Sequence, residues 1–218
     1  MKINKLGHCC LVVEVDGKRV MTDPGSYIDD KENKIRNEEK NIDLIVITHE
    51  HPDHLHVESL KIIVANNPNA VIVTNTAVGK ILDEAGVTYS KLEDGQNGEY
   101  AGVYLEAHGE KHEEIYEEFG QVQNTGYFIG RDLFYPGDAF TNPNKKVDIL
   151  ALPIAGPWMR IKDAIDYTLQ LKPRICFPVH EGMMMSDRPG PIYRIPNSVL
   201  PKNNIQFKVL EIGKEEEI

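Results

Sequence analysis

The chain has few cysteines, and their positions exclude a disulfide framework. Only three of its 218 residues are cysteines, and two of these, Cys9 and Cys10, are adjacent. Neighbouring cysteines can bridge each other only with strain. The count and the spacing are therefore typical of a protein that works in a reducing compartment.

Long hydrophobic runs are also missing from the sequence. No apolar stretch reaches the roughly 18 residues that a membrane helix requires. The N-terminal segment MKINKLGHCCLVVEVDG is strand-like and lacks the basic, apolar and small-residue regions of a signal peptide. We therefore expect a cytoplasmic protein without a membrane partner.

Positive charge is scarce relative to negative charge. The chain has 24 Lys and Arg residues against 34 Asp and Glu residues, which gives a formal net charge of −10. Nucleic-acid binding depends largely on neutralisation of phosphates by Lys and Arg, so this balance argues against DNA or RNA as the main partner. We expect a small-molecule substrate, and the sequence leaves the formation of a homo-oligomer open.

The composition is otherwise that of a globular chain, with 41% hydrophobic and 27% charged residues. Its length favours a single domain over residues 1–218. Two β-rich runs separated by Asp16-Gly17 predict a hairpin near the N-terminus. The polar segment 25–42 is expected to be a solvated surface loop, with a lid over a functional site as the alternative.

Alternating strands and helices follow this segment. Apolar runs at 42–47 and 70–74 predict buried strands, each followed by a helical pattern. Thr76 and Gly86 are the expected caps of the second helix. The second half of the chain repeats the plan, with glycine-broken strands, a buried strand at 147–154 and an amphipathic helix at 161–173. This order predicts an α/β fold built as a four-layer αββα sandwich.

The segment THEHPDHLH (48–56) contains four of the eight histidines in the chain. His49 and His51 are two residues apart, so their side chains leave an extended segment on the same side. Asp53 and His54 follow where a helix is expected to start. Imidazoles and carboxylates bind zinc and its first-row neighbours. A lone histidine is more often structural, but three of them beside a carboxylate after a buried strand predict a metal site.

Three more ligand-type residues end later strands: His108, Asp138 and His180. Binding sites in open α/β sheets gather outside the carboxyl ends of the strands. Taken alone, each of these residues is better explained as a polar side chain at a strand end that is exposed to solvent. Together with the histidine-rich loop they form a coherent set of seven ligands.

These motifs resemble those of the metallo-β-lactamase superfamily. The pattern H-x-H-x-D-H after a buried strand is followed in the family's order by His, Asp and His at strand ends, and TDPG (22–25) follows the first hairpin. The finer motifs are GH at 7–8, AHG at 107–109, YPGD at 135–138, LPI at 152–154 and PVH at 178–180. They are similar to single-domain metal-dependent hydrolases grouped with ascorbate-6-phosphate lactonase.

The resemblance implies a site for two divalent metal ions. Zn²⁺ is the ion we expect first, with Mn²⁺ and iron left open. The implied ligands are His49, His51 and His108 for one ion, Asp53, His54 and His180 for the other, and Asp138 as a bridge. A water shared by two such ions has a pKa lowered towards about 7, and the resulting hydroxide would attack a small ester, lactone or phosphoester. Asp53 is the expected catalytic residue, which orients this hydroxide and receives its proton.

Other positions carry weaker expectations. Asp23 matches the family's aspartate that orients a ligand histidine, with a turn residue before Pro24 as the alternative. His8 either points into the site or is a core histidine. Trp158 and Met159 are candidate pocket residues, as are Met183–Met185, although methionine runs more often fill gaps.

Several further residues have no motif that assigns them a role. His56 and His112 are expected on the surface. The candidates for substrate contact are Arg160, Arg188, Tyr193 and Arg194.

Two other functions compete with hydrolysis. An iron-dependent oxidoreductase could use the same ligands, as persulfide dioxygenases of this superfamily do. A non-catalytic metal-binding module on an enzyme fold is the third hypothesis, because a fold alone does not determine function. The missing His-Thr-Pro-Gly-His segment argues against a thioesterase that resembles glyoxalase II. The acidic stretch at 112–123 argues against an anionic substrate.

Overall fold

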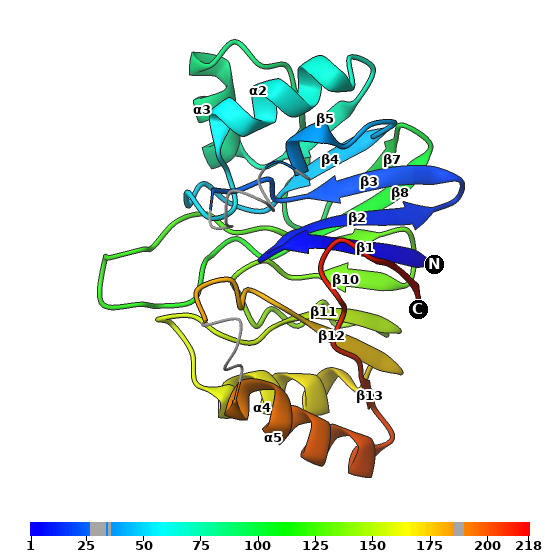
Figure 1. The fold of residues 1–218 in the computed structure, drawn as a ribbon. Coiled ribbons are helices and arrows are strands. Elements are labelled where there is room, and N and C mark those ends of the chain that lie inside the picture. The colour runs from blue at the N-terminus through cyan, green and yellow to red at the C-terminus, as the bar shows by residue number, and fades with distance from the viewer. Residues whose placement is uncertain (27–33, 35, 185–189) are drawn as a thin grey trace.

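The computed structural model describes residues 1–26, 34, 36–184 and 190–218. Within them, two seven-stranded sheets lie between helices on their outer sides (Figure 1). Helices α2 (Val57–Asn66) and α3 (Thr76–Glu84) cover the first sheet, and α4 (Ile161–Leu171) and α5 (Pro191–Val199) cover the second. The predicted αββα sandwich is confirmed.

The first sheet contains the N-terminal hairpin. Its strands, in order across the sheet, are β14 (Glu215–Glu217), β1 (Lys2–Gly7), β2 (Cys10–Val15), β3 (Lys18–Thr22), β4 (Leu44–Ile47), β5 (Val71–Thr74) and β6 (Ser90–Lys91). Pairing is antiparallel from β14 to β3 and parallel from β3 to β6. Asp16 and Gly17 join β2 to β3 with φ angles of 53° and 72°, as a two-residue type I′ turn requires. The predicted hairpin is therefore present.

The second sheet repeats this arrangement. Its strands, in order, are β13 (Gln206–Phe207), β12 (Ile175–Val179), β11 (Ile149–Pro153), β10 (Leu133–Tyr135), β9 (Gly126–Ile129), β8 (Val103–His108) and β7 (Asn97–Tyr100), with a short 3₁₀ helix at Leu200–Asn203 before β13. Pairing is antiparallel from β7 to β10 and parallel from β10 to β13. Each sheet therefore has a parallel half whose strand ends can carry functional side chains.

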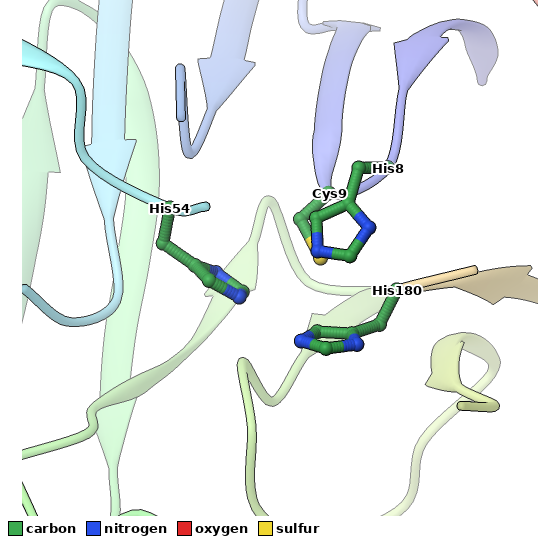
Figure 2. Close-up of side chains that lie close together, drawn as sticks. All are labelled: His8, Cys9, His54 and His180. Carbon is green, nitrogen blue, oxygen red and sulfur yellow. The ribbon is translucent and has the colours of Figure 1, made fainter. Parts of the chain in front are cut away.

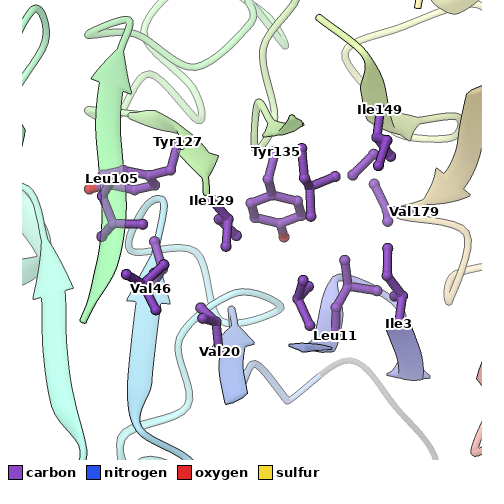
Figure 3. Close-up of a cluster of buried hydrophobic side chains, with 14 of the residues drawn as sticks. Ile3, Leu11, Val20, Val46, Leu105, Tyr127, Ile129, Tyr135, Ile149 and Val179 are labelled. Carbon is purple, nitrogen blue, oxygen red and sulfur yellow. The ribbon is translucent and has the colours of Figure 1, made fainter. Parts of the chain in front are cut away.

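Among the described residues, three hydrophobic clusters hold the layers together. The largest lies between the sheets, where Val20 and Val46 of the first sheet meet Ile129 and Tyr135 of the second (Figure 3). Each of these four residues is fully buried. The other two clusters fill the space between each sheet and its helices. The strands that end near the site are thus packed on both faces.

The caps of α3 differ from the prediction by one residue. Asn75 is the N-cap, and its side chain accepts a hydrogen bond from the backbone N–H of Val78. The prediction of Thr76 as the N-cap was wrong because the side chain of Asn75 takes the backbone N–H of Val78. The amide nitrogen of Asn75 also donates a hydrogen bond to the Thr48 carbonyl at 2.8 Å. Ala85 is the C-cap, and Gly86 follows it with a φ of 69°.

The segment 25–42 can be described only in part, because residues 27–33 and 35 lie outside the described residues. The expectation of a lid therefore falls largely outside them. Arg36 is fully buried and donates hydrogen bonds to the Gly25 carbonyl and the Ser59 hydroxyl. This residue does not belong to a solvated loop. None of the described helices has the length and apolar character needed to cross a membrane.

Candidate metal centre

The histidine-rich loop begins one residue after β4, and hydrogen bonds fix its shape. The His51 carbonyl accepts from the backbone N–H groups of His54 and Leu55, each at 2.9 Å. Gly25 lies against the loop so closely that a Cβ there would be 1.8 Å from the Asp53 carbonyl oxygen. The glycine of TDPG is therefore required by close backbone approach.

Among the described residues, two groups of ligand-type side chains each contain two residues of this loop. The first consists of His49, His51 and His112, and the second of Asp53, His54, Asp138 and His180. Within each group, one ligand atom per residue lies within 4.8 Å of all the others. All predicted ligands except His108 belong to one of these groups.

Asp138 connects the two groups. Its Oδ2 lies 3.3 Å from His112 Nε2 and 3.9 Å from His49 Nε2 in the first group. Its Oδ1 lies 3.2 Å from His54 Nε2, and its Oδ2 lies 2.7 Å from His180 Nε2, both in the second group. One carboxylate therefore faces both groups, as a bridging ligand must.

The ligand atoms at this junction are buried without hydrogen-bond partners. They are His49 Nε2, His54 Nε2, His112 Nε2, Asp138 Oδ1 and both ring nitrogens of His180. Buried polar atoms in proteins are nearly always paired, since an unpaired one costs about 1–3 kcal/mol. Imidazole nitrogens and a carboxylate oxygen converging in this way form a donor set suited to divalent metal ions. The residues present therefore fit a metal centre.

The pKa shifts of Asp138, His54 and His180 show that this carboxylate requires positive charge beside it. Burial alone would raise the pKa of Asp138, but the imidazoles of His54 and His180 hold it well below its usual range. Burial alone would lower the pKa values of His54 and His180, yet Asp138 raises both well above the ordinary value. In the metal-free protein, protons on these rings therefore supply the charge that a metal ion would replace.

His49 and Asp53 are already in the ionisation states that metal binding requires. Burial, together with the neighbouring His54, lowers the pKa of His49 well below its ordinary value, so its ring stays neutral. Burial opposes ionisation of Asp53, but the neighbouring imidazoles of His180 and His8 strongly lower its pKa. A neutral imidazole and an ionised carboxylate are the ligand forms of these side chains.

Polar contacts behind the ligands orient them. The Asp23 carboxylate lies 2.8 Å from His54 Nδ1 and accepts hydrogen bonds from the Thr48 hydroxyl and the Tyr135 hydroxyl. The Thr48 hydroxyl also lies 3.0 Å from His49 Nδ1. Such partners fix which ring nitrogen faces a metal. These contacts place Asp23 directly behind the ring of His54.

Trp158 and His8 also reach the centre. The indole Nε1 of Trp158 donates to Asp138 Oδ2 at 3.2 Å, and its ring lies against those of His112 and His180. His8 Nε2 lies 3.2 Å from Asp53 Oδ2, while its Nδ1 accepts from the backbone N–H of Gly182 at 2.9 Å. The ring of His8 therefore points towards Asp53 of the second group and is itself buried.

The structure places His108 outside the centre, so its assignment as a ligand is corrected. Burial along β8 alternates, with Val103, Leu105 and Ala107 fully buried. His108 falls on the other face of the strand, where its Nε2 lies 2.8 Å from Glu106 Oε1 and its ring contacts Phe128. A strand sends successive side chains to opposite faces, so His108 cannot point where the buried residues point.

His112 occupies the place that His108 was expected to take. Its predicted surface location was wrong, because it is only 3% exposed and its ring lies 5.1 Å from that of His49 and 4.7 Å from that of His51. The backbone N–H of His112 donates to the Val122 carbonyl, which holds it after β8. The signal in the sequence was the second histidine of HGEKH. His56, by contrast, is exposed as expected.

The weaker candidates for pocket and substrate contact lie elsewhere or have other partners. Met159 is half-buried and packs against the cluster beneath α4. Arg160 is exposed and pairs with Asp163 at the start of α4. The Tyr193 hydroxyl donates to Glu181 at 2.9 Å, and Arg194 is exposed. Met183 and Met184 are exposed, while Met185 and Arg188 lie outside the described residues.

Comparison with known proteins identifies the family of this fold and site. The family model described as the β-lactamase superfamily domain matches residues 2–180. Protein Rv0786c of Mycobacterium tuberculosis is 31% identical over 198 residues, which cover 88% of this chain and 90% of that protein. A UPF0173 metal-dependent hydrolase of Thermoplasma acidophilum is 29% identical over 190 residues, which cover 83% of each.

A solved structure shows the same fold. That of Igni18, a metallo hydrolase from Ignicoccus hospitalis, aligns with a TM-score of 0.75 at 21% sequence identity and covers 100% of this chain and 98% of that one. Because the family model spans most of the chain and its fold and ligand-type residues agree, the chain belongs to the metallo-β-lactamase superfamily.

Proposed function

We propose that this chain, a metal-dependent hydrolase of the metallo-β-lactamase superfamily, acts through two divalent metal ions on a small ester, lactone or phosphoester. The ligands we assign are His49, His51 and His112 for the first ion, Asp53, His54 and His180 for the second, and Asp138 for both. The observation that carries the proposal is the convergence of buried, unpartnered ligand atoms from both groups on the two oxygens of Asp138. Zn²⁺ suits this mixture of imidazole and carboxylate ligands, and Mn²⁺ and iron share the preference.

When bound, two such ions would supply Lewis acidity and a water whose pKa is lowered towards about 7. The protein's own part is to place a proton acceptor beside that water. Asp53 suits this role because its side chain is 18% exposed, whereas that of Asp138 is 3% exposed and lies between the two groups. The hydrogen bond with His8 holds Asp53 in place. Asp53 therefore is the residue we assign to orient the attacking water and receive its proton.

The remaining contacts keep the ligands in one arrangement. Asp23 and Thr48 hold the far nitrogens of His54 and His49, and Trp158 holds one oxygen of Asp138. Ligands fixed in this way lose little conformational freedom when an ion binds. Burial of the ligands other than His51 and Asp53 also limits contact with bulk water, which strengthens each electrostatic interaction among them. The arrangement supports chemistry at a pre-shaped site.

Metal analysis of the purified full chain tests the proposal. We expect about two equivalents of divalent metal per chain, with loss of metal and of activity on lactone and phosphoester panels in Asp138→Ala. His56→Ala is the matched control, because His56 lies in the same loop but is exposed, and it should retain both ions. A full chain with no affinity for divalent metals would overturn the proposal. Iron content combined with substrate-dependent oxygen consumption would instead favour an oxidoreductase.

A further inference from the structure

Of the three cysteines, Cys9 alone packs beside the metal centre. It precedes β2, is 1% exposed and belongs to the cluster between the sheets. Its neighbour Cys10 belongs to the cluster beneath α2 and α3, and Cys176 belongs to the cluster beneath α4 and α5. The adjacent cysteines therefore face opposite sides of the first sheet, and only one of them meets the histidines.

The thiol of Cys9 lies within a group of imidazoles. Its sulfur and one ring nitrogen from each of His8, His54 and His180 all lie within 4.8 Å of one another, and all four residues are buried (Figure 2). The Nε2 atoms of His54 and His180 lie 3.2 Å and 2.7 Å from Asp138 oxygens without hydrogen-bond geometry, and Nδ1 of His180 is also buried without a hydrogen-bond partner. These unpartnered, fully buried nitrogens indicate that the group is built to receive a ligand.

The protonation of His8 separates it from the other members. Because His8 Nδ1 accepts a hydrogen bond from the backbone N–H of Gly182, the proton of the neutral ring must be on Nε2. That proton faces Asp53 Oδ2 at 3.2 Å. The ring thus donates to Asp53 and has no lone pair to offer an ion. The available ligand atoms are those of Cys9, His54 and His180.

We propose that Cys9, His54 and His180 form an inner position for a thiophilic divalent cation such as Zn²⁺, Co²⁺ or Cd²⁺. This inference rests on the proposed metal centre, whose second ion shares His54 and His180. Ligand atoms on one zinc ion lie about 2.0–2.3 Å from it, which places them about 3.3–3.8 Å from one another in a tetrahedral site. The ligand atoms here lie within 4.8 Å of one another, so the group must contract by up to about 1 Å when the ion binds. Binding releases the thiol proton to solvent and forms the metal–sulfur bond.

The inner position gives the second ion two alternative sets of ligands. The outer set adds Asp53 and Asp138 to the two histidines, and the inner set adds the Cys9 sulfur. Thiolate favours zinc and other soft ions, whereas carboxylates also serve Mn²⁺. Cys9 therefore determines which metal the second position prefers, and a soft ion drawn inward leaves the Asp53 carboxylate without a metal.

Cobalt substitution of the metal-free full chain tests this assignment. Wild type and Cys10→Ser, the matched control, should develop sulfur-to-cobalt charge-transfer absorption as Co²⁺ is added, and Cys9→Ser should lose it. Two bound Co²⁺ ions without this absorption in wild type would overturn the inner position and leave the proposed function standing. Absorption that persists in Cys9→Ser would also overturn it, because the sulfur ligand would then be another cysteine. A chain that binds no Co²⁺ would overturn the proposed centre together with this inference.

Calorimetric titration with Cd²⁺ and Mn²⁺ supplies a second readout. Loss of a residue that only hydrogen-bonds to a metal ligand already costs about 10–100-fold in metal affinity. In Cys9→Ala, which loses a proposed ligand itself, the affinity of the second site for Cd²⁺ should therefore fall by at least about tenfold. The affinity for Mn²⁺ should not change, because its oxygen ligands remain. Equal weakening for both ions would indicate a packing role for Cys9, and unchanged affinity for Cd²⁺ would exclude a bond to sulfur. Either result would overturn the inference.

Discussion

Asp23 accepts a hydrogen bond from Nδ1 of His54 across 2.8 Å, and this contact leaves Nε2 of His54 facing Asp138. The carboxylate of Asp23 is held in turn by Thr48 and Tyr135. A carboxylate behind a ligand histidine fixes the tautomer and raises the basicity of the ring. The relationship links the carboxyl end of β3 to the metal centre and makes the orientation of His54 a property of the fold.

Replacing Asp23 with Asn should therefore weaken binding of the second ion. Loss of such a partner typically costs about 10–100-fold in metal affinity, and isothermal titration with Zn²⁺ would measure it. Tyr135→Phe is the matched control, since it removes one donor to Asp23 and leaves the Asp23–His54 contact. Its effect should be several-fold smaller. Equal losses in the two variants would show that burial of the network, and not the charge on Asp23, governs affinity.

A second prediction distinguishes the two histidines of the segment HGEKH. His112→Ala should lower the metal content and abolish activity, because its Nε2 faces Asp138 at 3.3 Å. His108→Ala should retain the metal, because its side chain faces Glu106 on the other side of β8. Metal analysis of the two purified variants measures the difference. Loss of metal from His108→Ala alone would reverse our assignment.

These two histidines also show how far the sequence can predict the site. The loop residues were identifiable because their spacing is local and follows a buried strand. The choice between His108 and His112 depends on the face of β8, and the alternation of Val103, Leu105 and Ala107 already places His108 on the opposite face. The position of His108 at the end of a strand favours it as a ligand, but the alternation along β8 is the stronger signal.

The contacts behind the ligands were less accessible to prediction. Trp158 is 20 residues from Asp138 in the sequence, and Tyr135 is 112 residues from Asp23. Such pairs depend on how the two sheets pack, which periodicity within one segment cannot reveal. The layer architecture was predictable because it follows from the order of strands and helices. The hydrogen-bond partner of each buried polar atom was not predictable from the sequence.

A third prediction concerns the close approach of Gly25 to the loop. Gly25→Ala would place a Cβ 1.8 Å from the Asp53 carbonyl oxygen, so the backbone must move. We expect a loss of stability of at least about 1–3 kcal/mol, the usual range for overpacking, together with weaker metal binding. Gly86→Ala is the control, because Gly86 has a φ of 69° but nothing within 4 Å of a Cβ. Urea unfolding should show the larger loss for Gly25→Ala, and the reverse order would contradict steric contact as the cause.

A fourth prediction concerns the pH dependence of the metal-free protein. The pKa values of His54 and His180 are raised above the ordinary 6.5 by Asp138, against the effect of burial. Groups with a raised folded pKa stabilise the protein fully below their unfolded pKa, and this stability is lost as the pH rises through the folded value. The melting temperature of the metal-free protein should therefore fall as the pH rises above about 6.5.

Two other groups contribute stability that is lost when the pH falls below about 6.5. The pKa of His49 is lowered well below 6.5 by burial, and that of Asp138 is lowered by His54 and His180 despite burial. Stability from these groups is lost as the pH falls towards their folded values. Zinc should remove the decline above pH 6.5, because a metal ion replaces the protons on the rings. An identical alkaline decline with and without zinc would exclude His54 and His180 as its source.

A fifth prediction uses the single tryptophan of the chain as a probe. Trp158 is the only tryptophan, and its indole N–H donates to Asp138 at 3.2 Å. A paramagnetic Co²⁺ ion bound to Asp138 would lie close to the indole, so titration with Co²⁺ should quench the intrinsic fluorescence until the sites are full. Asp138→Asn should require much more Co²⁺ for the same quenching, because the bridging charge is lost. Full fluorescence in a chain shown by metal analysis to hold two Co²⁺ ions would place both ions away from Asp138.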